Sequence, residues 1–135
     1  MTPMTVSVVV PVRHEERHIR RTLEGLRRQE FDPEAFEVLV VDGESEDATV
    51  QRVREASSGF RWLRILSNPK RLSSSARNIG FEKARGEYVV VVDGHCELEN
   101  PRYLANLVEA FESSGADSLG RPQPLQAPDP SAFQT

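Results

Sequence analysis

An aspartate and a histidine, separated by one glycine, directly follow a short and continuous apolar run in this sequence. The run is Tyr88–Val92, whose aromatic and β-branched residues are typical of a strand that is buried on both faces. Side chains two positions apart on extended backbone point the same way, so Asp93 and His95 could share one ion or ligand. The alternative is a polar turn after the strand, because Asp-Gly is a common turn pair.

Two earlier strands are also predicted to end in residues that could do chemistry. Val6–Val10 is expected to be a strand that closes at Pro11, which cannot donate a backbone hydrogen bond, and Val38–Val41 is expected to be a second strand. In open α/β sheets, ligands bind at the edge where the carboxyl ends of the strands meet. The polar residues expected at this edge are Arg13, His14 and Glu15 after the first strand, Asp42, Glu44 and Asp47 after the second, and Asp93 and His95 after the last.

This set of side chains favours a metal ion and an anionic ligand. The glycine-rich dinucleotide fingerprint and the P-loop lysine motif are both missing after the first strand, so the phosphates of a nucleotide would have to be held by a metal and by arginines. Carboxylates with one imidazole suit Mg²⁺ or, better, Mn²⁺. Arg77, near the start of a predicted helix, could meet an anion there, or could be an ordinary exposed helix arginine.

Strands and helices alternate along the sequence at intervals of roughly 25–31 residues, which matches the size of βαβ units and predicts an α/β fold with a mainly parallel sheet. A third strand is expected at Trp62–Leu66. The expected helices cover residues 14–29, 45–56 and 73–85, and a fourth begins at Pro101. The expected caps are Ser45, one of Ser73–Ser75, Asn100 and, at the end of the third helix, Gly86.

Length and composition indicate one globular domain. The chain has 135 residues, 38% of them hydrophobic and 28% charged, and its formal net charge of −4 argues against a general nucleic-acid binder. We expect the domain at residues 1–120, with a short strand near Ser118–Leu119, and a proline-rich extended tail at 121–135. The single cysteine, Cys96, excludes an internal disulfide and fits a reducing cytoplasm. Apolar runs fall far short of the about 20 residues that span a bilayer.

Four segments of the sequence resemble successive motifs of the family 2 glycosyltransferases, in the same order and with similar spacing. The likeness covers about residues 5–120, nearly the whole chain. The most similar subgroup is that of the succinoglycan-type glycosyltransferases, which build bacterial polysaccharides. The four segments are Val8–Glu16, Val40–Thr49, Ala76–Gly80 and Val91–His95.

The resemblance implies a three-layer αβα fold of the GT-A type that binds a nucleoside-diphosphate sugar, usually a UDP-sugar, together with a divalent metal ion. His95 stands where the family's D-x-D motif has its last, metal-binding aspartate. Enzymes of this kind invert the anomeric centre by direct displacement, and a carboxylate deprotonates the acceptor hydroxyl. By motif match, Pro11, Val12, Arg13 and Asp42 would contact the base, Glu15 would belong to the same nucleotide-sugar site, Arg77 would lie near the base or phosphates, and Asp93 would lie near the ribose and the metal.

The sequence departs from the family pattern at two places. Asp42-Gly43-Glu44-Ser45 stands where Asp-Asp-Gly-Ser is usual, and Asp93-Gly94-His95 keeps one carboxylate of the D-x-D motif. The acceptor-binding half, with the catalytic base, is expected beyond residue 135, and residues 121–135 could be its start. We therefore expect a donor-binding part, either truncated or dependent on a partner, which would be inactive by itself.

The expected partners are a nucleoside-diphosphate sugar and a saccharide or lipid-linked acceptor, in the cytoplasm or at the inner face of the membrane. The six arginines between residues 13 and 28 are either a solvated face or a surface that rests on anionic lipid. Self-association could occur through surface that the missing half would cover. Two alternatives stay open: a non-catalytic α/β binding module, and a sugar-1-phosphate nucleotidyltransferase, which would need a glycine-rich basic loop where Pro11–Glu15 stands.

Overall fold

The computed structural model of the chain describes residues 3–114, and the predicted strand near Ser118–Leu119 and the tail at 121–135 lie outside them. Strands and helices alternate along this part of the chain, as the sequence predicts. The elements are β1 (Val6–Val12), α1 (Ile19–Arg27), β2 (Phe36–Asp42), α2 (Thr49–Ala56), the 3₁₀ turn η1 (Ser57–Gly59), β3 (Leu63–Ser67), α3 (Ser73–Lys83), β4 (Tyr88–Val91) and α4 (Tyr103–Ser114).

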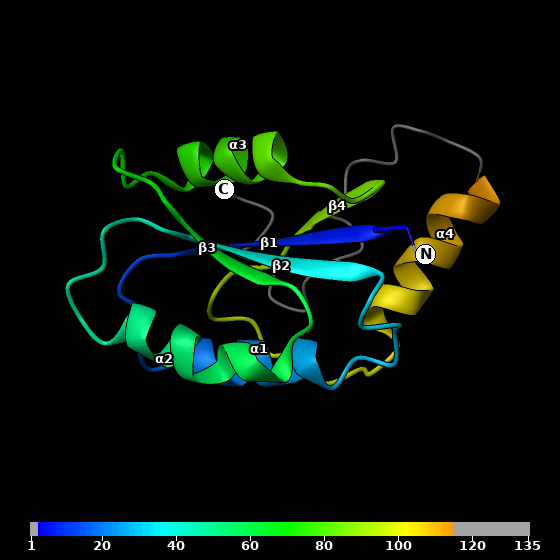
Figure 1. Ribbon diagram of the computed structural model, residues 1–135, viewed down its shortest axis with the longest axis horizontal. Helices are drawn as coiled ribbons and strands as arrows, with labels where there is room; N and C mark the ends of the chain where they lie inside the picture. Colours follow the sequence, from blue (N-terminus) through cyan, green and yellow to red (C-terminus); the bar gives the residue numbers. More distant parts are fainter. Residues whose placement is uncertain (1–2, 115–135) are drawn as a thin grey trace.

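The four strands of the described residues form one sheet in the order β3-β2-β1-β4. All of the strand pairs are parallel. The register aligns Val12 with Asp42 and Asp42 with Ser67, so β1, β2 and β3 end at the same level. The loops that follow these strands therefore lie at one edge of the sheet, which confirms the predicted parallel α/β architecture (Figure 1).

Helices cover both faces of the sheet, with α3 on one face and α1 and α2 on the other (Figure 1). Alternate side chains of β1 pack on the two faces of the sheet, because successive side chains along a strand point to opposite sides. Val6, Val8 and Val10 pack with the apolar residues of α1, whereas Val9 packs with Ala76 of α3. Helix α4 joins the first of these clusters beside the amino ends of the strands. The three-layer arrangement is therefore held together by a sheet that is buried on both sides.

Gly80 lets α3 approach β1 closely. A Cβ atom at this position would lie 2.4 Å from Cγ1 and 2.7 Å from Cγ2 of Val9, whose side chain is completely buried. Contacts this short require the helix or the strand to move, because packed interiors have no space for added atoms. The spacing between α3 and the sheet therefore depends on a glycine at this position.

We expect Gly80→Val to lower the free energy of unfolding by about 2–3 kcal/mol, the upper part of the usual range for overpacked cores. Urea denaturation followed by the fluorescence of Trp62 would measure this change. Gly59→Val is the matched control, because the added atoms meet the exposed side chain of Arg27, which can move away. A Gly80 variant that unfolds at the wild-type urea concentration would contradict the described packing of α3.

The expectation that Pro11 ends the first strand is wrong, since β1 continues to Val12. The carbonyl of Val9 accepts a hydrogen bond from the amide of Val92 at 2.9 Å, so the odd-numbered residues of β1 direct their backbone groups toward β4. The ladder with β4 ends at the pair of Val9 and Val91, which leaves no β4 carbonyl opposite Pro11. The missing N–H of Pro11 therefore removes no hydrogen bond of the sheet, and the strand continues beside β2.

The expectation of a helix from His14 is also wrong, because α1 begins at Ile19. His14 has a φ of 56°, a left-handed backbone conformation that is incompatible with a right-handed helix. The backbone amides of residues 14–16 donate instead to side chains of the β2–α2 loop and of Thr49, the first residue of α2. Contacts between distant loops thus override the helical pattern of these residues.

The predicted N-cap serines are wrong, because Ala48 precedes α2 and Leu72 precedes α3. Ser45 accepts a hydrogen bond from the amide of His14, and Ser75 lies inside α3 with its Oγ 2.8 Å from the carbonyl oxygen of Leu72. Side chains that could cap a helix therefore have other partners here.

The remaining two predicted caps also have other partners. Gly86 lies beyond the C-cap of α3, and its amide donates to Ser7 Oγ at 2.8 Å. Asn100 stabilises the turn before α4, where its Oδ1 accepts a hydrogen bond from the amide of Arg102 at 2.9 Å. Helix boundaries at both positions are displaced by two residues because the turn residues bond locally or to a neighbouring strand.

Candidate functional site

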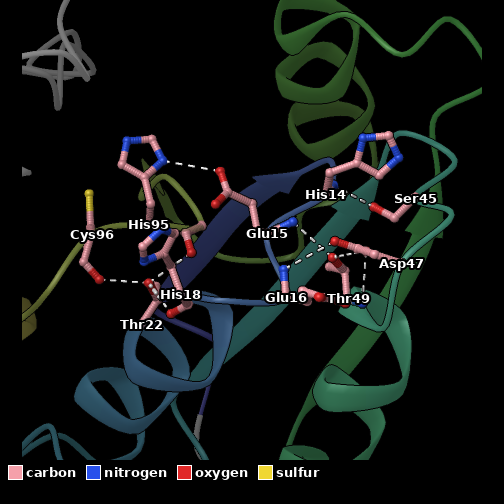
Figure 2. A network of polar contacts seen from close by, with 11 residues as sticks. His14, Glu15, Glu16, His18, Thr22, Ser45, Asp47, Thr49, His95 and Cys96 are labelled. Carbon is pink, nitrogen blue, oxygen red and sulfur yellow. Dashed lines mark hydrogen bonds and ion pairs between the residues drawn. The ribbon is translucent and has the colours of Figure 1, made fainter.

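Three successive backbone amides fasten the loop after β1 to the loop after β2 and to the first residue of α2 (Figure 2). The amide of His14 donates to Ser45 Oγ at 2.9 Å, that of Glu15 to Thr49 Oγ1 at 2.8 Å, and that of Glu16 to Asp47 Oδ2 at 3.4 Å. In nucleotide-binding folds with a glycine-rich loop, amides at this position hold phosphates. Here they already bind side chains of the protein, so the phosphates of a ligand would need other donors.

Asp47 keeps its charge in this network. Partial burial alone would raise the pKa of Asp47, but hydrogen bonds from the hydroxyl and amide of Thr49 and from the amide of Glu16, together with the nearby His14, hold that pKa below its usual value. The carboxylate therefore accepts these hydrogen bonds throughout the neutral pH range and keeps the two loops together.

Left-handed backbone at non-glycine residues is found in the loops at this edge of the sheet. Within residues 3–114 these residues are His14 (φ 56°) after β1, Glu44 (φ 60°) after β2 and Arg71 (φ 64°) after β3. Each such conformation costs about 1–3 kcal/mol, and they concentrate at functional sites. Their positions favour this edge as the functional one.

A cleft of about 500 Å³ opens at the same edge, a volume in the range of small-molecule sites. It is formed by the ends of β1 and β4, the β3–α3 loop and the amino end of α3. Six of the eight predicted site residues line it. These are Pro11, Val12, Arg13, Glu15, Asp93 and His95, and the other lining residues are Asn68, Arg71, Leu72, Ser73 and Ala76.

The two other predicted residues, Asp42 and Arg77, lie beside the cleft and not in its lining. Oδ2 of Asp42 accepts a hydrogen bond from the amide of Ser45 at 3.2 Å, so this carboxylate stabilises its own loop. Arg77 is half-buried on α3 and follows the lining residue Ala76. Both stay predicted donor-site residues at the border of the cleft.

Among the described residues, two arginines line the cleft, and both are anchored to the β2–α2 loop. Arg13 donates through Nε to the carbonyl of Gly43 at 2.9 Å, and Arg71 donates through Nε to Glu44 Oε1 at 2.6 Å. Anchoring through Nε leaves the terminal Nη donors of each guanidinium group for a ligand. The cleft therefore holds two fixed cations of the kind that bind phosphates.

Asp93 and His95 lie on a turn after β4, closed by a hydrogen bond from Cys96 N to Asp93 O at 3.1 Å. The expectation of extended backbone through His95 is therefore wrong, and the alternative of a polar turn is the one observed. The buried Oγ1 of Thr22, on α1, lies 3.0 Å from the carbonyl oxygen of Gly94 and 2.6 Å from that of Cys96. The turn still brings both predicted metal ligands to the cleft.

The side chains of the cleft fit an ion that binds together with a nucleotide. In the part of the chain from 3 to 114, no three His, Cys, Asp or Glu side chains are grouped so that they could hold an ion by themselves. Asp93 and His95 offer one carboxylate and one imidazole. Mg²⁺ at nucleotide sites is commonly held by one or two carboxylates, with substrate phosphates and water completing its ligands, and an imidazole suits Mn²⁺ as well.

The β3–α3 loop is the part of the cleft that sequence analysis missed. Asn68, which is 2% exposed, donates through Nδ2 to the carbonyl of Leu72 at 2.9 Å, and its Oδ1 accepts a hydrogen bond from Ser75 at 2.8 Å. This loop brings Arg71 to the cleft. A signal was available, because the loop after a third parallel strand must reach the same edge as the loops after the others.

A larger hollow, of about 890 Å³, runs along the outer side of α1. Arg20 pairs with Glu55 at 3.3 Å and Arg21 with Glu97 at 3.1 Å, so its charges are partly balanced. This arrangement favours the interpretation of the arginine-rich side of α1 as a solvated helix face. Separately, no helix between residues 3 and 114 is both long enough and apolar enough to pass through a bilayer. The charged residues that line the hollow are Arg17, Arg20, Arg21, Arg28, Glu24, Glu97 and Glu99.

Comparison with known proteins shows the same family that the motifs resemble. The family described as glycosyl transferase family 2 matches residues 7–123. The succinoglycan biosynthesis protein ExoA of Rhizobium meliloti (strain 1021) is 31% identical over 121 residues, which cover 88% of this chain and 36% of ExoA. The predicted resemblance to succinoglycan-type proteins is therefore confirmed.

Two solved structures share the fold. The crystal structure of S. aureus TarS 1-349 in complex with UDP has a TM-score of 0.72 and 29% sequence identity, over 82% of this chain and 32% of that one. The mannosyltransferase PcManGT from Pyrobaculum calidifontis, in complex with GDP-Man and Mn²⁺, has a TM-score of 0.75 and 28% identity, over 82% of this chain and 33% of that one. The predicted GT-A fold is confirmed by these similarities.

The chain spans about a third of the length of the curated relatives it matches. Within the chain, however, the family match begins at the second residue of β1 and includes the other strands of residues 3–114 and the whole lining of the cleft. With the motifs, the parallel sheet and the solved structures in agreement, this chain belongs to glycosyl transferase family 2.

Proposed function

We propose that this chain is the donor-binding part of a metal-dependent glycosyltransferase, with the nucleoside-diphosphate sugar bound in the cleft at the carboxyl edge of the sheet. The proposal rests on one observation: the anchored Arg13 and Arg71 line the same cleft as Asp93 and His95. Arginines bind phosphates, and a carboxylate with an imidazole binds a divalent ion, so the set is complementary to a metal-bound diphosphate.

Under this proposal the site residues have separate roles. Pro11, Val12, Arg13 and Asp42 contact the base, and the terminal nitrogens of Arg13 and Arg71 reach the phosphates. Glu15 belongs to the same site, Arg77 lies near the base or phosphates, and Asp93 and His95 hold Mn²⁺ or Mg²⁺. When bound, the ion offsets the negative charge that develops on the departing diphosphate. The protein fixes its own groups in advance through the contacts between the β1–α1 and β2–α2 loops.

We propose a UDP-sugar as the donor and a saccharide or lipid-linked molecule as the acceptor, with inversion at the anomeric centre and with the enzyme in the cytoplasm or at the inner membrane face. TarS was crystallised with UDP and PcManGT with GDP-Man, so proteins of this fold bind either base. The catalytic base would be a carboxylate in a part of the enzyme that has no counterpart here, since the chain spans about a third of its relatives' length.

Calorimetric titration of UDP into the chain, with and without Mn²⁺, tests the donor site, and GDP is the matched control nucleotide. We expect Mn²⁺ to strengthen UDP binding by at least about tenfold, or ~1.4 kcal/mol, because the ion links the diphosphate to the cleft. GDP should bind more weakly than UDP under the same conditions.

The other results of this titration point to different functions. Tighter binding of GDP than of UDP would keep the donor site but change the base it recognises. Failure of both nucleotides to bind, with and without Mn²⁺, would contradict the donor site and favour a non-catalytic α/β module. Preference for UTP over UDP would favour a nucleotidyltransferase.

A further inference from the structure

Glu15 and His95 meet at the cleft, although they are 80 positions apart in the sequence (Figure 2). The ring Nδ1 of His95 lies 3.2 Å from Oε2 of Glu15. The two side chains are 37% and 21% exposed, respectively, so the contact is sheltered but reachable from the cleft. It joins the loop after β1 to the turn after β4.

Both partners of this contact are held in place by neighbouring elements. The amide of Glu15 donates to Thr49 Oγ1 at 2.8 Å, which fixes the start of that side chain. The hydroxyl of Thr22 contacts the carbonyl oxygens of Gly94 and Cys96, the residues on either side of the histidine. Side chains of α1 and α2 therefore hold the loop and the turn that carry the pair.

Gly94 makes the close approach of the turn possible. A Cβ atom at this position would lie 2.7 Å from Cγ1 of Val12 and 3.4 Å from Cγ of Glu15. A larger residue would push the turn away from the end of β1, because Val12 is buried. The glycine between the two predicted metal ligands therefore has a steric role in bringing the histidine to Glu15.

The chemistry of the contact selects one form of the histidine ring. An ionised carboxylate accepts hydrogen bonds and cannot donate them, so the ring nitrogen that faces it must carry the hydrogen. Glu15 thereby favours the Nδ1–H form of neutral His95, in which the lone pair is on Nε2. Metal-binding histidines commonly donate their second ring N–H to a carboxylate or a carbonyl oxygen in this way.

We propose that Glu15 is a positioning residue that holds His95 in the orientation and tautomer in which Nε2 binds the metal ion. This inference rests on the proposed function, because His95 is the proposed metal ligand. In the family's usual D-x-D motif an aspartate stands at this position, and a carboxylate has no tautomer to select. The role of Glu15 thus follows from the replacement of that aspartate by histidine in this chain.

The tautomer can be measured on the metal-free chain by ¹⁵N NMR of the imidazole nitrogens, at a pH where neutral imidazole predominates. The chain has three histidines, so the spectrum of His95→Ala identifies the signals of His95. We expect the Nδ1–H form in the wild type and a shift toward the Nε2–H form in Glu15→Ala. Glu15→Gln should restore most of the wild-type pattern, because its amide oxygen can still accept the hydrogen bond. A wild-type chain in the Nε2–H form would overturn the proposal.

Metal affinity gives the second readout, measured from the electron paramagnetic resonance signal of unbound Mn²⁺ in the presence of UDP. Glu15→Ala should weaken Mn²⁺ binding by about 10–100-fold, the usual effect of losing a residue that orients a metal ligand. In the His95→Asp background the same substitution should change the affinity by less than about twofold. Glu16→Ala is the matched control, because Oε1 of Glu16 accepts the amide of Ala48 at 2.8 Å and the side chain does not line the cleft.

The double-variant comparison separates positioning from a merely structural role. An equal loss of Mn²⁺ affinity on Glu15→Ala in both backgrounds would show that Glu15 supports the loop in general, and it would overturn the proposal. Unchanged Mn²⁺ binding in Glu15→Ala would overturn the role of Glu15 alone. Absence of Mn²⁺ binding by the wild-type chain with UDP would overturn the proposed function itself.

Discussion

Asp93→Ala is expected to abolish Mn²⁺-dependent binding of UDP, with a loss of affinity of at least about 100-fold, the upper limit for residues that merely orient a metal ligand. Asp93 is the carboxylate of the proposed ion site and lines the cleft. Without it, His95 would be left as the side-chain ligand, and hard ions such as Mg²⁺ and Mn²⁺ bind mainly through oxygen. Calorimetry with UDP and Mn²⁺ measures the effect, and binding of UDP without metal should change much less.

The control for Asp93→Ala is the removal of another carboxylate from the segment after β4. Glu97→Ala removes a carboxylate that pairs with Arg21 at 3.1 Å on the outer side of α1, away from the cleft lining. It should bind UDP and Mn²⁺ as the wild type does. If Asp93→Ala keeps the wild-type affinity for UDP in the presence of Mn²⁺, Asp93 does not belong to the site.

The position of the cleft could be predicted from the sequence because it follows from the direction of the strands. Each buried strand ends in polar residues, and the βαβ spacing makes the strands parallel, so their ends must meet. Arg13, Asp93 and His95 meet in this way, although the strands that precede Arg13 and Asp93 are far apart in the sequence. No knowledge of side-chain packing was needed for this step.

The paths of the loops could not be predicted in the same way, because they depend on hydrogen bonds between distant residues. The residues from His14 onward have a helical periodicity, yet the amide of His14 donates to the hydroxyl of Ser45, 31 positions away. The helical pattern reports a local preference, and a few long-range hydrogen bonds are enough to reverse it. The same reason explains why Ser45 does not cap α2 and why the contact of Glu15 with His95 was not foreseen.

Arg71 shows a different limit. Its sequence neighbourhood is a polar segment between a strand and a helix, which alone does not distinguish a ligand-binding residue from a solvated one. Its importance comes from the left-handed backbone and from the ion pair with Glu44, which connects the loops after β2 and β3. Glu44 is also one of the residues at which the sequence departs from the family motif. A departure from a motif can therefore indicate a compensating partner elsewhere in the chain.

Glu37→Ala is expected to lower the free energy of unfolding by about 3–5 kcal/mol, the usual effect of removing one member of a buried charged network. Glu37 is 2% exposed on β2. Its Oε2 accepts hydrogen bonds from Ser7 Oγ at 2.6 Å and from the amide of Arg85 at 2.8 Å, and Oε1 lies 3.5 Å from Nη2 of Arg64. One carboxylate thus connects β1, β2, β3 and the segment before β4, and its removal would leave buried donors without an acceptor.

Urea denaturation measures this loss, and Glu37→Gln is the matched variant. The glutamine keeps the size of the side chain and one acceptor oxygen, so we expect a smaller loss of about 1–3 kcal/mol. A loss below about 0.5 kcal/mol for Glu37→Ala would contradict the described network, because a surface substitution alone accounts for that much. Glu37 lies near the amino ends of the strands, opposite the cleft, so the folded fraction of either variant should bind UDP and Mn²⁺ with wild-type affinity. We therefore expect stability and the proposed donor binding to depend on opposite edges of the same sheet, so that each can be changed separately.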